Sequence, residues 1–346
     1  MSDVASGPIL QLRQIEKRFG DFAAVAGVDL DIAEGEFFTL VGPSGSGKTT
    51  MIRMLVGMER PTGGDILLRG QRINEMPANK RPTCMVFQSL ALFRHKSVGE
   101  NIEFSLKMKG VAAADRKRRA LEMMGAVRLA EDYYARPVTQ CSGGEQQRVA
   151  LARALASDPD ILFFDEPLSA IDYRLRKILE VEMKDIHRRT GKTFVYITHS
   201  LEEAMVMSDR IAIMRDGQIV QTGTPRDIYQ RPGSRFVAEF MGEVNVFTVR
   251  DEHMIEIDIA APGVADTYLV VRPEYLKKLP DGDAADFRFS ATIANEYMLG
   301  SRTQFHLAAG NATLVAELAA SGATGISTGN TATWGFNFVD AVMIDE

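Results

Sequence analysis

The sequence predicts an α/β fold with a mainly parallel sheet and a helical subdomain, followed by a small all-β domain. Up to about residue 224, short apolar runs of strand length alternate with helical stretches, as in parallel sheets flanked by helices. After about residue 242 the chain changes to short β-branched and aromatic runs separated by Gly, Pro, Asn and Asp, which favours a small barrel or sandwich. We therefore expect one domain over residues 1–235, with a helical insert at about 89–155, and an OB-like β-barrel over residues 236–346.

Length and composition place the chain among ordinary soluble globular proteins. Its 346 residues are enough for two domains, and 45% of them are hydrophobic and 25% charged. The longest apolar runs fall far short of the roughly 20 residues that span a bilayer, and the start of the chain lacks the pattern of a secretory signal. The two cysteines, Cys84 and Cys141, lie far apart, so we expect reduced thiols in a cytosolic protein.

The charge balance changes along the chain. Residues 1–235 hold 34 basic and 30 acidic side chains, whereas residues 236–346 hold 6 basic and 16 acidic ones. This shift supports a domain boundary near the stretch QRPGSRF. Neither part has the large basic excess of a nucleic-acid-binding domain, so we expect no nucleic-acid partner.

Local patterns place individual elements of the first domain. The runs at Phe37–Val41, 161–164 and 194–198 are short and apolar, which is typical of buried strands. The stretch 97–138 has few strand signals and is expected to be helical. Asp216-Gly217 between apolar residues predicts a β-hairpin.

The stretch GPSGSGKT, residues 42–49, matches the phosphate-binding pattern G-x-x-x-x-G-K-[ST], and we call it the phosphate loop. It follows the strand FFTLV and precedes the helical run TTMIRMLVGM, which is the context that this loop requires. Its glycines let backbone amides surround a β-phosphate, Lys48 reaches the β- and γ-phosphates, and the Thr49 hydroxyl ligates Mg²⁺. The residues expected to bind nucleotide here are Gly42, Pro43, Ser44, Gly45, Ser46, Gly47, Lys48, Thr49 and Thr50.

The run DILFFDEP supplies carboxylates that complement the phosphate loop. Asp165 ends an apolar strand, where it can hold Mg²⁺ through water, and Glu166 can activate the attacking water. A GTPase would need an N-K-x-D base reader, but the nearest string, NKRP at residues 79–82, lacks the Asp. We therefore expect ATP and Mg²⁺ as cofactors, with Lys48 and Glu166 as catalytic residues.

A second candidate anion site lies at Ser142-Gly143-Gly144, directly before a helix-forming run. It cannot serve the same nucleotide if Lys48 and Asp165 already surround it. The difficulty is resolved if this segment faces the γ-phosphate of a nucleotide held by another subunit.

With these motifs in this order, residues of about 10–235 resemble the ATPase subunit of an ABC transporter. The resemblance implies a homodimer that holds two ATP molecules head-to-tail, each between the phosphate loop of one subunit and the signature helix of the other. Ser142, Gly143, Gly144 and Glu145 would then bind nucleotide in trans. Binding of two ATP molecules would close the dimer, and hydrolysis would reopen it.

The resemblance gives roles to residues whose type alone would not indicate them. Phe19, which alone would be read as a core residue, corresponds to an aromatic residue that stacks on adenine. Gln88, by default a surface residue, corresponds to the glutamine that contacts Mg²⁺ and water and faces the permease. Asp172 corresponds to an acidic loop that crosses the dimer interface. His199, after the strand TFVYIT, corresponds to the catalytic histidine that contacts the γ-phosphate.

The chain departs from the family pattern at a few positions. Cys141 and Ile171 each replace Leu, Glu145 replaces Gln, Ser200 replaces Asp, and Arg94 replaces Pro. We expect Cys141 to fill a similar apolar volume. Arg94 lies in the region that should meet the permease, so it bears on partner geometry rather than on hydrolysis.

The C-terminal segments VRPE, residues 271–274, and YMLGSRTQFHL, residues 297–307, resemble the small β-barrel appended to import ATPases for polyamines, ferric iron, sugars and related solutes. Two roles stay open for this second domain: a regulatory site, or a module that only stabilises the dimer.

Together these resemblances imply the ATP-hydrolysing subunit of an ABC import complex at the cytoplasmic face of a bacterial inner membrane. Its partners would be two transmembrane permease subunits and, through them, an extracytoplasmic solute-binding protein. The C-terminal motifs favour polyamines (spermidine or putrescine), with ferric iron, sugar or phosphonate import as alternatives. A non-transport ABC ATPase of DNA repair or translation would need coiled-coil insertions or a second cassette, and the sequence has neither.

Overall fold

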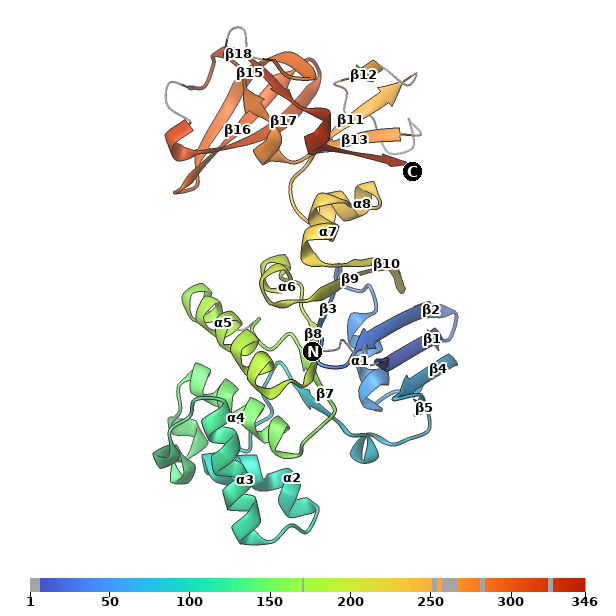
Figure 1. Cartoon of the computed structure of the whole chain (residues 1–346), viewed down its shortest axis with the longest axis vertical. Helices are drawn as coiled ribbons and strands as arrows, with labels where there is room; N and C mark the ends of the chain where they lie inside the picture. The colour runs from blue at the N-terminus through green and yellow to red at the C-terminus, as the bar shows by residue number, and fades with distance from the viewer. Residues whose placement is uncertain are drawn as a thin grey trace, which may run out of the picture. The chain divides into compact units, whose positions relative to one another are not determined.

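The computed structural model describes residues 7–169, 171–250, 254–256, 267–280, 284–322 and 326–345 (Figure 1). The chain divides into two compact units, and the division falls between Pro225 and Arg226. The stretch QRPGSRF joins helix α7 (Pro225–Gln230) to helix α8 (Arg235–Phe240). The boundary expected at residue 235 therefore lies inside the second unit, at the start of α8.

The first unit combines strands and helices along its whole length. Its strands are β1 (Pro8–Phe19), β2 (Phe22–Ala33), β3 (Phe37–Val41), β4 (Gly63–Leu68), β5 (Gln71–Arg72), β6 (Thr83–Val86), β7 (Ile161–Asp165), β8 (Thr193–Ile197), β9 (Arg210–Arg215) and β10 (Gln218–Gly223). Its helices are α1 (Lys48–Val56), α2 (Val98–Met108), α3 (Ala113–Ala126), α4 (Gly143–Ala156), α5 (Tyr173–Thr190) and α6 (Leu201–Met207), with short 3-10 turns η1 (Ala78–Lys80), η2 (Glu131–Ala135) and η3 (Val138–Gln140). No helix in the described part of the chain combines the length and the apolar character that a membrane crossing requires.

A six-stranded sheet forms the centre of the first unit, in the order β10-β9-β3-β8-β7-β6. Strands β9, β3, β8, β7 and β6 run parallel, and β10 pairs antiparallel with β9 at the edge. The predicted mainly parallel sheet is therefore confirmed. β10 follows β9 through the predicted hairpin, whose turn residues Asp216 and Gly217 have φ values of 49° and 80°, as a type I′ turn requires.

A second sheet, of order β2-β1-β4-β5, is antiparallel throughout. The sequence patterns did not predict it as a separate sheet. Its strand β1 has register shifts between Leu12 and Lys17 and a positive φ of 47° at Gln14. Such irregularities break the two-residue alternation that would otherwise mark a half-buried strand.

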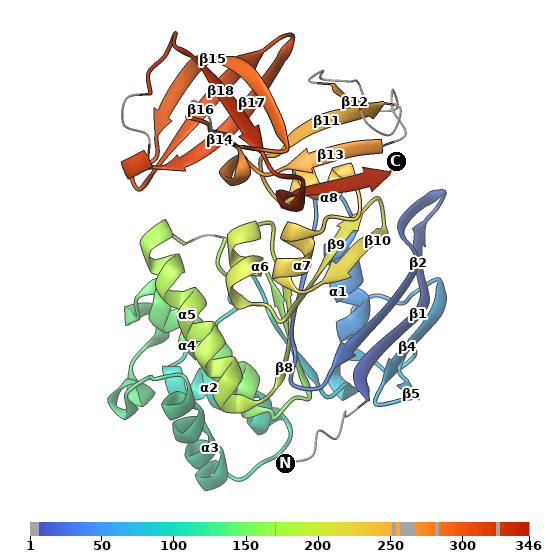
Figure 2. The ribbon, with the colours of Figure 1, turned by 45° about the horizontal axis from the view of Figure 1, so that its top comes forward.

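The parallel sheet separates two hydrophobic cores. Leu162 and Phe164 of β7 face a core shared with helices α2 to α5, whereas Ile161 and Phe163 of the same strand face a core shared with α1 and the antiparallel sheet. Figures 1 and 2 show α1 on one side of the sheet, and α4 with α5 on the other. Strand side chains alternate between the two faces of a sheet, and α1 and α4 each pack on one of these faces. The two candidate anion sites, at the N-termini of α1 and α4, therefore belong to opposite faces of the sheet.

The helical region predicted within the first domain contains α2, α3 and α4. Helix α2 begins at a capping box, in which the Ser97 hydroxyl accepts the N–H of Glu100 and the Glu100 carboxylate accepts the N–H of Ser97. These two bonds satisfy amides that the first turn of a helix leaves unpaired.

The second unit is built mainly from strands. They are β11 (Asn245–Arg250), β12 (Met254–Glu256), β13 (Thr267–Val271), β14 (Lys277–Lys278), β15 (Phe287–Met298), β16 (Arg302–Ala309), β17 (Ala312–Ala319), β18 (Thr331–Phe336) and β19 (Ala341–Asp345), with 3-10 turns η4 (Pro273–Tyr275), η5 (Ala320–Gly322) and η6 (Phe338–Asp340). They form one sheet of order β12-β11-β13-β19 and one of order β14-β18-β15-β16-β17. The second sheet curls like half of a barrel (Figure 2), and the predicted all-β domain is confirmed.

The VRPE stretch has a structural place in the second unit. Arg272, only 4% exposed, donates hydrogen bonds to the carbonyls of Ala238, Gly242 and Glu243. Glu274 accepts the hydroxyl of Tyr229 at 2.8 Å. The motif thus ties strand β13 to the segment around helices α7 and α8.

Asn245 joins the two sheets of the second unit. Its side chain is buried, its Nδ2 donates to the carbonyl of Val315 at 2.8 Å, and its Oδ1 accepts the N–H of Val315 at 2.7 Å. The amide therefore forms the pair of hydrogen bonds that a strand residue would, and connects β11 of one sheet to β17 of the other.

We expect Asn245→Ala to lower the free energy of unfolding of the second unit by roughly 2 kcal/mol, because two hydrogen bonds disappear and the Val315 backbone loses both partners. Thermal unfolding of the full chain measures this loss. Asn311→Ala, at an exposed turn residue, is the matched control and should leave the transition within about 0.5 kcal/mol. Equal stability of the two variants would contradict the bridging role.

Candidate active site

The C-terminal ends of four parallel strands bring most of the predicted site together. β3 leads into the phosphate loop, β7 ends at Asp165, β8 is followed by His199, and β6 shortly precedes Gln88. Ile197, the last residue of β8, pairs with Leu40 of β3 on one side and with Asp165 on the other, so these strand ends are level. In open α/β sheets, ligands bind at the carboxyl ends of the strands.

The phosphate loop has a conformation that depends on glycine. Gly47 has a φ of 104°, and a Cβ added there would lie 2.2 Å from the carbonyl oxygen of Ala24. The loop is also held from outside, because the N–H of Gly217 in the β9–β10 turn donates to the carbonyl of Ser46 at 3.1 Å. Helix α1 then begins at Lys48 without a side-chain cap, which leaves its first amides for an anion.

Lys48 curls back over the phosphate loop. Its Nζ donates to the carbonyls of Gly42 and Pro43, both at 2.8 Å, and lies 3.4 Å from the Ser46 hydroxyl. Burial lowers the pKa of Lys48, and the negative charges of Glu166 and Asp165 act in the opposite direction. Phosphate oxygens could replace the loop carbonyls as acceptors and supply the negative charge that a buried ammonium favours.

Glu166 and His199 form a pair beside this loop. The Nδ1 of His199 lies 3.0 Å from the Oε2 of Glu166. The side chain of His199 is 61% exposed and that of Glu166 is 28% exposed, so the pair faces solvent. A carboxylate in this position can accept a proton from a water molecule, and the imidazole fixes its orientation.

The turn at Glu166 is held in an uncommon conformation. Glu166 has a φ of 47°, its N–H donates to the carbonyl of Ile197 at 2.9 Å, and its carbonyl accepts both the N–H and the hydroxyl of Ser169. The hydroxyl of Ser169 also accepts a bond from the Nε2 of Gln88 at 2.9 Å, which places Gln88 beside the carboxylate turn. Sequence reasoning missed Ser169, although a serine shortly after a strand end, here four residues beyond Asp165, is a common turn-forming residue.

The segment that carries His199 rests on a buried carboxylate. Glu203, 2% exposed, accepts the hydroxyls of Tyr196 and Thr198, both at 2.8 Å. The Thr198 hydroxyl oxygen accepts the N–H of Ser200, and the Ser200 hydroxyl caps helix α6 by accepting the N–H of Glu203. Sequence reasoning missed Glu203; the S-x-x-E pattern of a helix start was readable, but the strand hydroxyls that meet it depend on the tertiary fold.

Phe19 lies outside the parallel sheet, at the end of β1, and pairs with Phe22 across the β1–β2 hairpin. Its side chain is 51% exposed, which rules out the core position that its residue type suggests. The same hairpin reaches the phosphate loop, because the carbonyl of Ala24 lies against Gly47. An exposed ring near the loop is suited to stacking on a planar base.

The second candidate anion site lies at the N-terminus of α4. The Ser142 hydroxyl accepts the N–H of Glu145, and the Glu145 carboxylate accepts the N–H of Ser142 at 2.7 Å and the hydroxyl of Tyr133 at 2.8 Å. The hydrogen bond from the Ser142 N–H to the carboxylate, followed by that from the Tyr133 hydroxyl, lowers the pKa of Glu145. Glu145 is thus engaged in capping its own helix, whereas a Cβ at Gly143 would meet no atom within 4 Å. The structure does not bring this site together with the phosphate loop, which belongs to the other face of the sheet.

The remaining predicted residues have clear structural positions. Asp172 caps helix α5 by accepting the N–H of Leu175 at 3.0 Å. Cys141 is buried in the core beneath α4, in keeping with its expected apolar role. Arg94 is exposed in the segment between β6 and α2.

The residues at the strand ends fit a nucleotide with Mg²⁺. The predicted ligands Thr49, Gln88 and Asp165 all offer oxygen atoms, which Mg²⁺ prefers. Burial raises the pKa of Asp165, and the adjacent Glu166 raises it further. A cation held there would stabilise both carboxylates in their charged form.

We expect Gly47→Ala to destabilise the nucleotide-free protein by roughly 3 kcal/mol or more, because the added Cβ would meet the Ala24 carbonyl. Gly45→Ala is the matched control, since Gly45 also has a positive φ, 81°, but a Cβ there meets no atom within 4 Å. It should cost only about 1 kcal/mol. Thermal unfolding compares the two, and equal losses would mean that the contact with β2 does not constrain the loop.

Several known proteins resemble this chain in sequence or in fold. A family model described as "ABC transporter" matches residues 25–169. The spermidine/putrescine import ATP-binding protein PotA of Mesorhizobium japonicum is 44% identical over 89% of this chain and 88% of that protein. Its counterpart in Roseobacter denitrificans is 50% identical over 69% of this chain and 66% of that protein. Among solved structures, the dimeric post-hydrolysis state of the ATP-binding cassette MJ0796 bound to ADP and Pi is 32% identical, covers 63% of this chain and 99% of that one, and has a TM-score of 0.54. The chain therefore belongs to the family of ABC-transporter ATP-binding subunits that includes the spermidine/putrescine import ATP-binding proteins.

Proposed function

We propose that the chain is the ATP-hydrolysing subunit of an ABC import complex for polyamines. The observation that carries the proposal is the Glu166–His199 pair, which lies beside Lys48 and the phosphate loop at the carboxyl ends of the parallel strands. The relatives named spermidine/putrescine import ATP-binding protein, with 42–50% identity to this chain in three bacteria, support the choice of solute.

In this proposal the chain's own groups divide the work of hydrolysis. The phosphate loop and the first amides of α1 bind and orient the phosphates. Lys48 exchanges its loop carbonyls for phosphate oxygens and places a positive charge where negative charge develops. Glu166 acts as general base toward the attacking water, and His199 orients it and contacts the γ-phosphate.

Mg²⁺ would be held by the Thr49 hydroxyl and, partly through water, by Asp165 and Gln88. When bound, the ion would supply positive charge that polarises the phosphate oxygens. The hydrogen bond from Gln88 to Ser169 links this set to the turn that carries Glu166, so the metal ligands and the base are positioned by the same few bonds.

A homodimer accounts for the two anion sites on opposite faces of the sheet. The N-terminus of α4, with Ser142, Gly143 and Gly144, would meet the nucleotide held by the phosphate loop of a second copy, and Asp172 would lie at the same interface. The exposure of Glu166 and His199 leaves their outer side open to such a partner. The dimeric ATP-binding cassette MJ0796, 32% identical to this chain, supports the arrangement.

The proposed complex lies at the cytoplasmic face of the bacterial inner membrane. Two permease subunits would form the pathway and contact the region of Gln88 and Arg94, and an extracytoplasmic binding protein would deliver solute to them. Closure of the ATPase dimer on two nucleotides would drive the permease, and hydrolysis would reopen it.

We expect Glu166→Gln to bind ATP but to lose turnover by about a hundredfold or more, because an amide cannot take the proton of the attacking water. Because this variant keeps its ATP unhydrolysed, it should shift from monomer to dimer when ATP is added, as measured by light scattering. Near-normal hydrolysis by Glu166→Gln would remove Glu166 from its assigned role.

The trans arrangement is tested in the Glu166→Gln background. Adding Gly143→Asp should abolish the ATP-driven dimer, because a carboxylate would face the γ-phosphate at a helix N-terminus. Gly125→Asp is the matched control: it adds the same charge at an exposed position of helix α3, where a Cβ would also meet no described atom within 4 Å. If ATP still dimerises the Gly143→Asp double variant, the N-terminus of α4 does not bind the second nucleotide.

The solute is tested by radiolabelled uptake in cells that lack this gene. We expect loss of spermidine or putrescine uptake, and recovery with the wild-type gene but not with Lys48→Ala. Ferric iron and maltose-like sugars are measured alongside. Unchanged polyamine uptake with loss of another solute would overturn the polyamine assignment and leave the importer proposal in place.

A further inference from the structure

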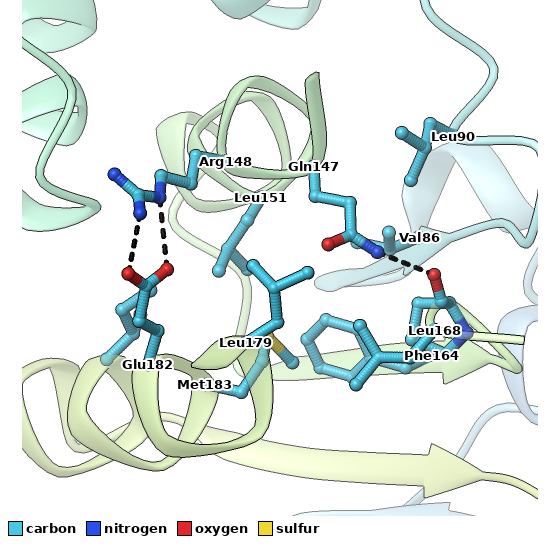
Figure 3. Close-up of a pocket in the computed structure, with 12 residues that line it drawn as sticks. Val86, Leu90, Gln147, Arg148, Leu151, Phe164, Leu168, Leu179, Glu182 and Met183 are labelled. Carbon is cyan, nitrogen blue, oxygen red and sulfur yellow. Dashed lines mark hydrogen bonds and ion pairs between the residues drawn. The ribbon is translucent and has the colours of Figure 1, made fainter. Parts of the chain in front are cut away.

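Gln147 lies one turn into helix α4 and reaches the turn that carries Glu166. Its Nε2 donates a hydrogen bond to the carbonyl of Pro167 at 2.7 Å. Figure 3 shows the amide crossing from α4 toward the segment after β7. A side chain of α4 is thus bonded to the residue that directly follows the proposed catalytic base.

This bond holds the turn at Pro167, next to the residues that hold it at Glu166. Glu166 is held by Ile197 and Ser169, and its φ of 47° is sustained only while such bonds persist. Pro167 has no N–H, so its carbonyl is the one backbone group through which the turn can be fixed at that residue. Gln147 supplies the donor for it.

The amide is poorly suited to its surroundings except for this bond. The Oε1 of Gln147 is buried and has no hydrogen-bond partner among the residues that the structure describes. The cavity beside it is lined mainly by the apolar side chains of Val86, Leu90, Leu151, Phe164, Leu168, Leu179, Met183 and Ile186 (Figure 3). A buried acceptor without a partner costs free energy, so an apolar residue of similar length would suit the packing better.

Helix α4 is attached to the body of the domain without the help of Gln147. The next residue, Arg148, makes a two-bond ion pair with Glu182 of α5, with distances of 3.1 and 2.5 Å. Loss of the Gln147 amide would therefore release the turn and leave the helix in place.

We propose that Gln147 is a positioning residue that couples helix α4 to the Glu166 turn. Through it, the helix whose N-terminus meets one nucleotide would also hold the base that acts on the other. This second step rests on the proposed dimer; the bond to the turn does not, because it lies within one chain.

The test is Gln147→Met, which keeps the length of the side chain and removes the donor. We expect the melting temperature to stay close to that of the wild type, because the variant removes the unpaired Oε1 but also takes the donor from the Pro167 carbonyl. The affinity for a non-hydrolysable ATP analogue should stay within about twofold. Turnover should fall about tenfold, the effect of one lost hydrogen bond on the base. Hydrogen–deuterium exchange of nucleotide-free protein should be faster in peptides that contain the Ser169 amide, a readout independent of hydrolysis.

Leu151→Ala is the matched control, since Leu151 lines the same cavity but makes no bond to the turn. It should lower the melting temperature and leave turnover and Ser169 exchange close to wild type. Unchanged turnover and exchange in Gln147→Met would overturn the inference, as would a joint loss of melting temperature, analogue affinity and turnover. A failure of the proposed function would look different, because the wild-type protein would then show no hydrolysis, or the Glu166→Gln variant would form no ATP-driven dimer.

Discussion

The backbone pairing of the parallel strands is the constraint on which the site depends. Ile197 pairs with Leu40 on one side and Asp165 on the other, so three strand ends stop at one level. The phosphate loop, the carboxylates and His199 are all within a few residues of these ends. Their distances are consequently set by hydrogen bonds between main chains, and the side chains need only to be oriented by local contacts such as those of Ser169 and Glu203.

The same sheet also explains why the two candidate anion sites of one chain are separate. Strand residues alternate between two cores, and α1 packs on one of them while α4 packs on the other. A rigid sheet between two helix N-termini keeps both from reaching a single nucleotide, and this makes a second copy of the chain a natural completion of the site. The Glu166 turn is hydrogen-bonded both to strand β8 and to helix α4, so it connects the strand ends of the sheet to the helix that carries the second candidate anion site.

Sequence patterns could predict what short stretches of chain decide by themselves. The phosphate loop, the Asp165–Glu166 strand end and the Asp216–Gly217 hairpin are encoded by adjacent residues, and the sheet and the turn followed as expected. Gln88 and His199 carry no local signal and were assigned only through resemblance. The partners Ser169 and Gln88, Glu203 and Tyr196, Gln147 and Pro167, and Asn245 and Val315 meet through the tertiary fold, so no pattern in one segment indicated them.

The placement of β3 at the centre of the sheet has a consequence for how the chain acquires its site during synthesis. β3 and the phosphate loop emerge early from the ribosome, but their neighbours β8 and β9, and the Gly217 N–H that holds Ser46, are made much later. An N-terminal fragment would carry the whole loop sequence without the strands that shape it. Because these later segments shape the loop, a bound nucleotide would stabilise only a nearly complete first unit.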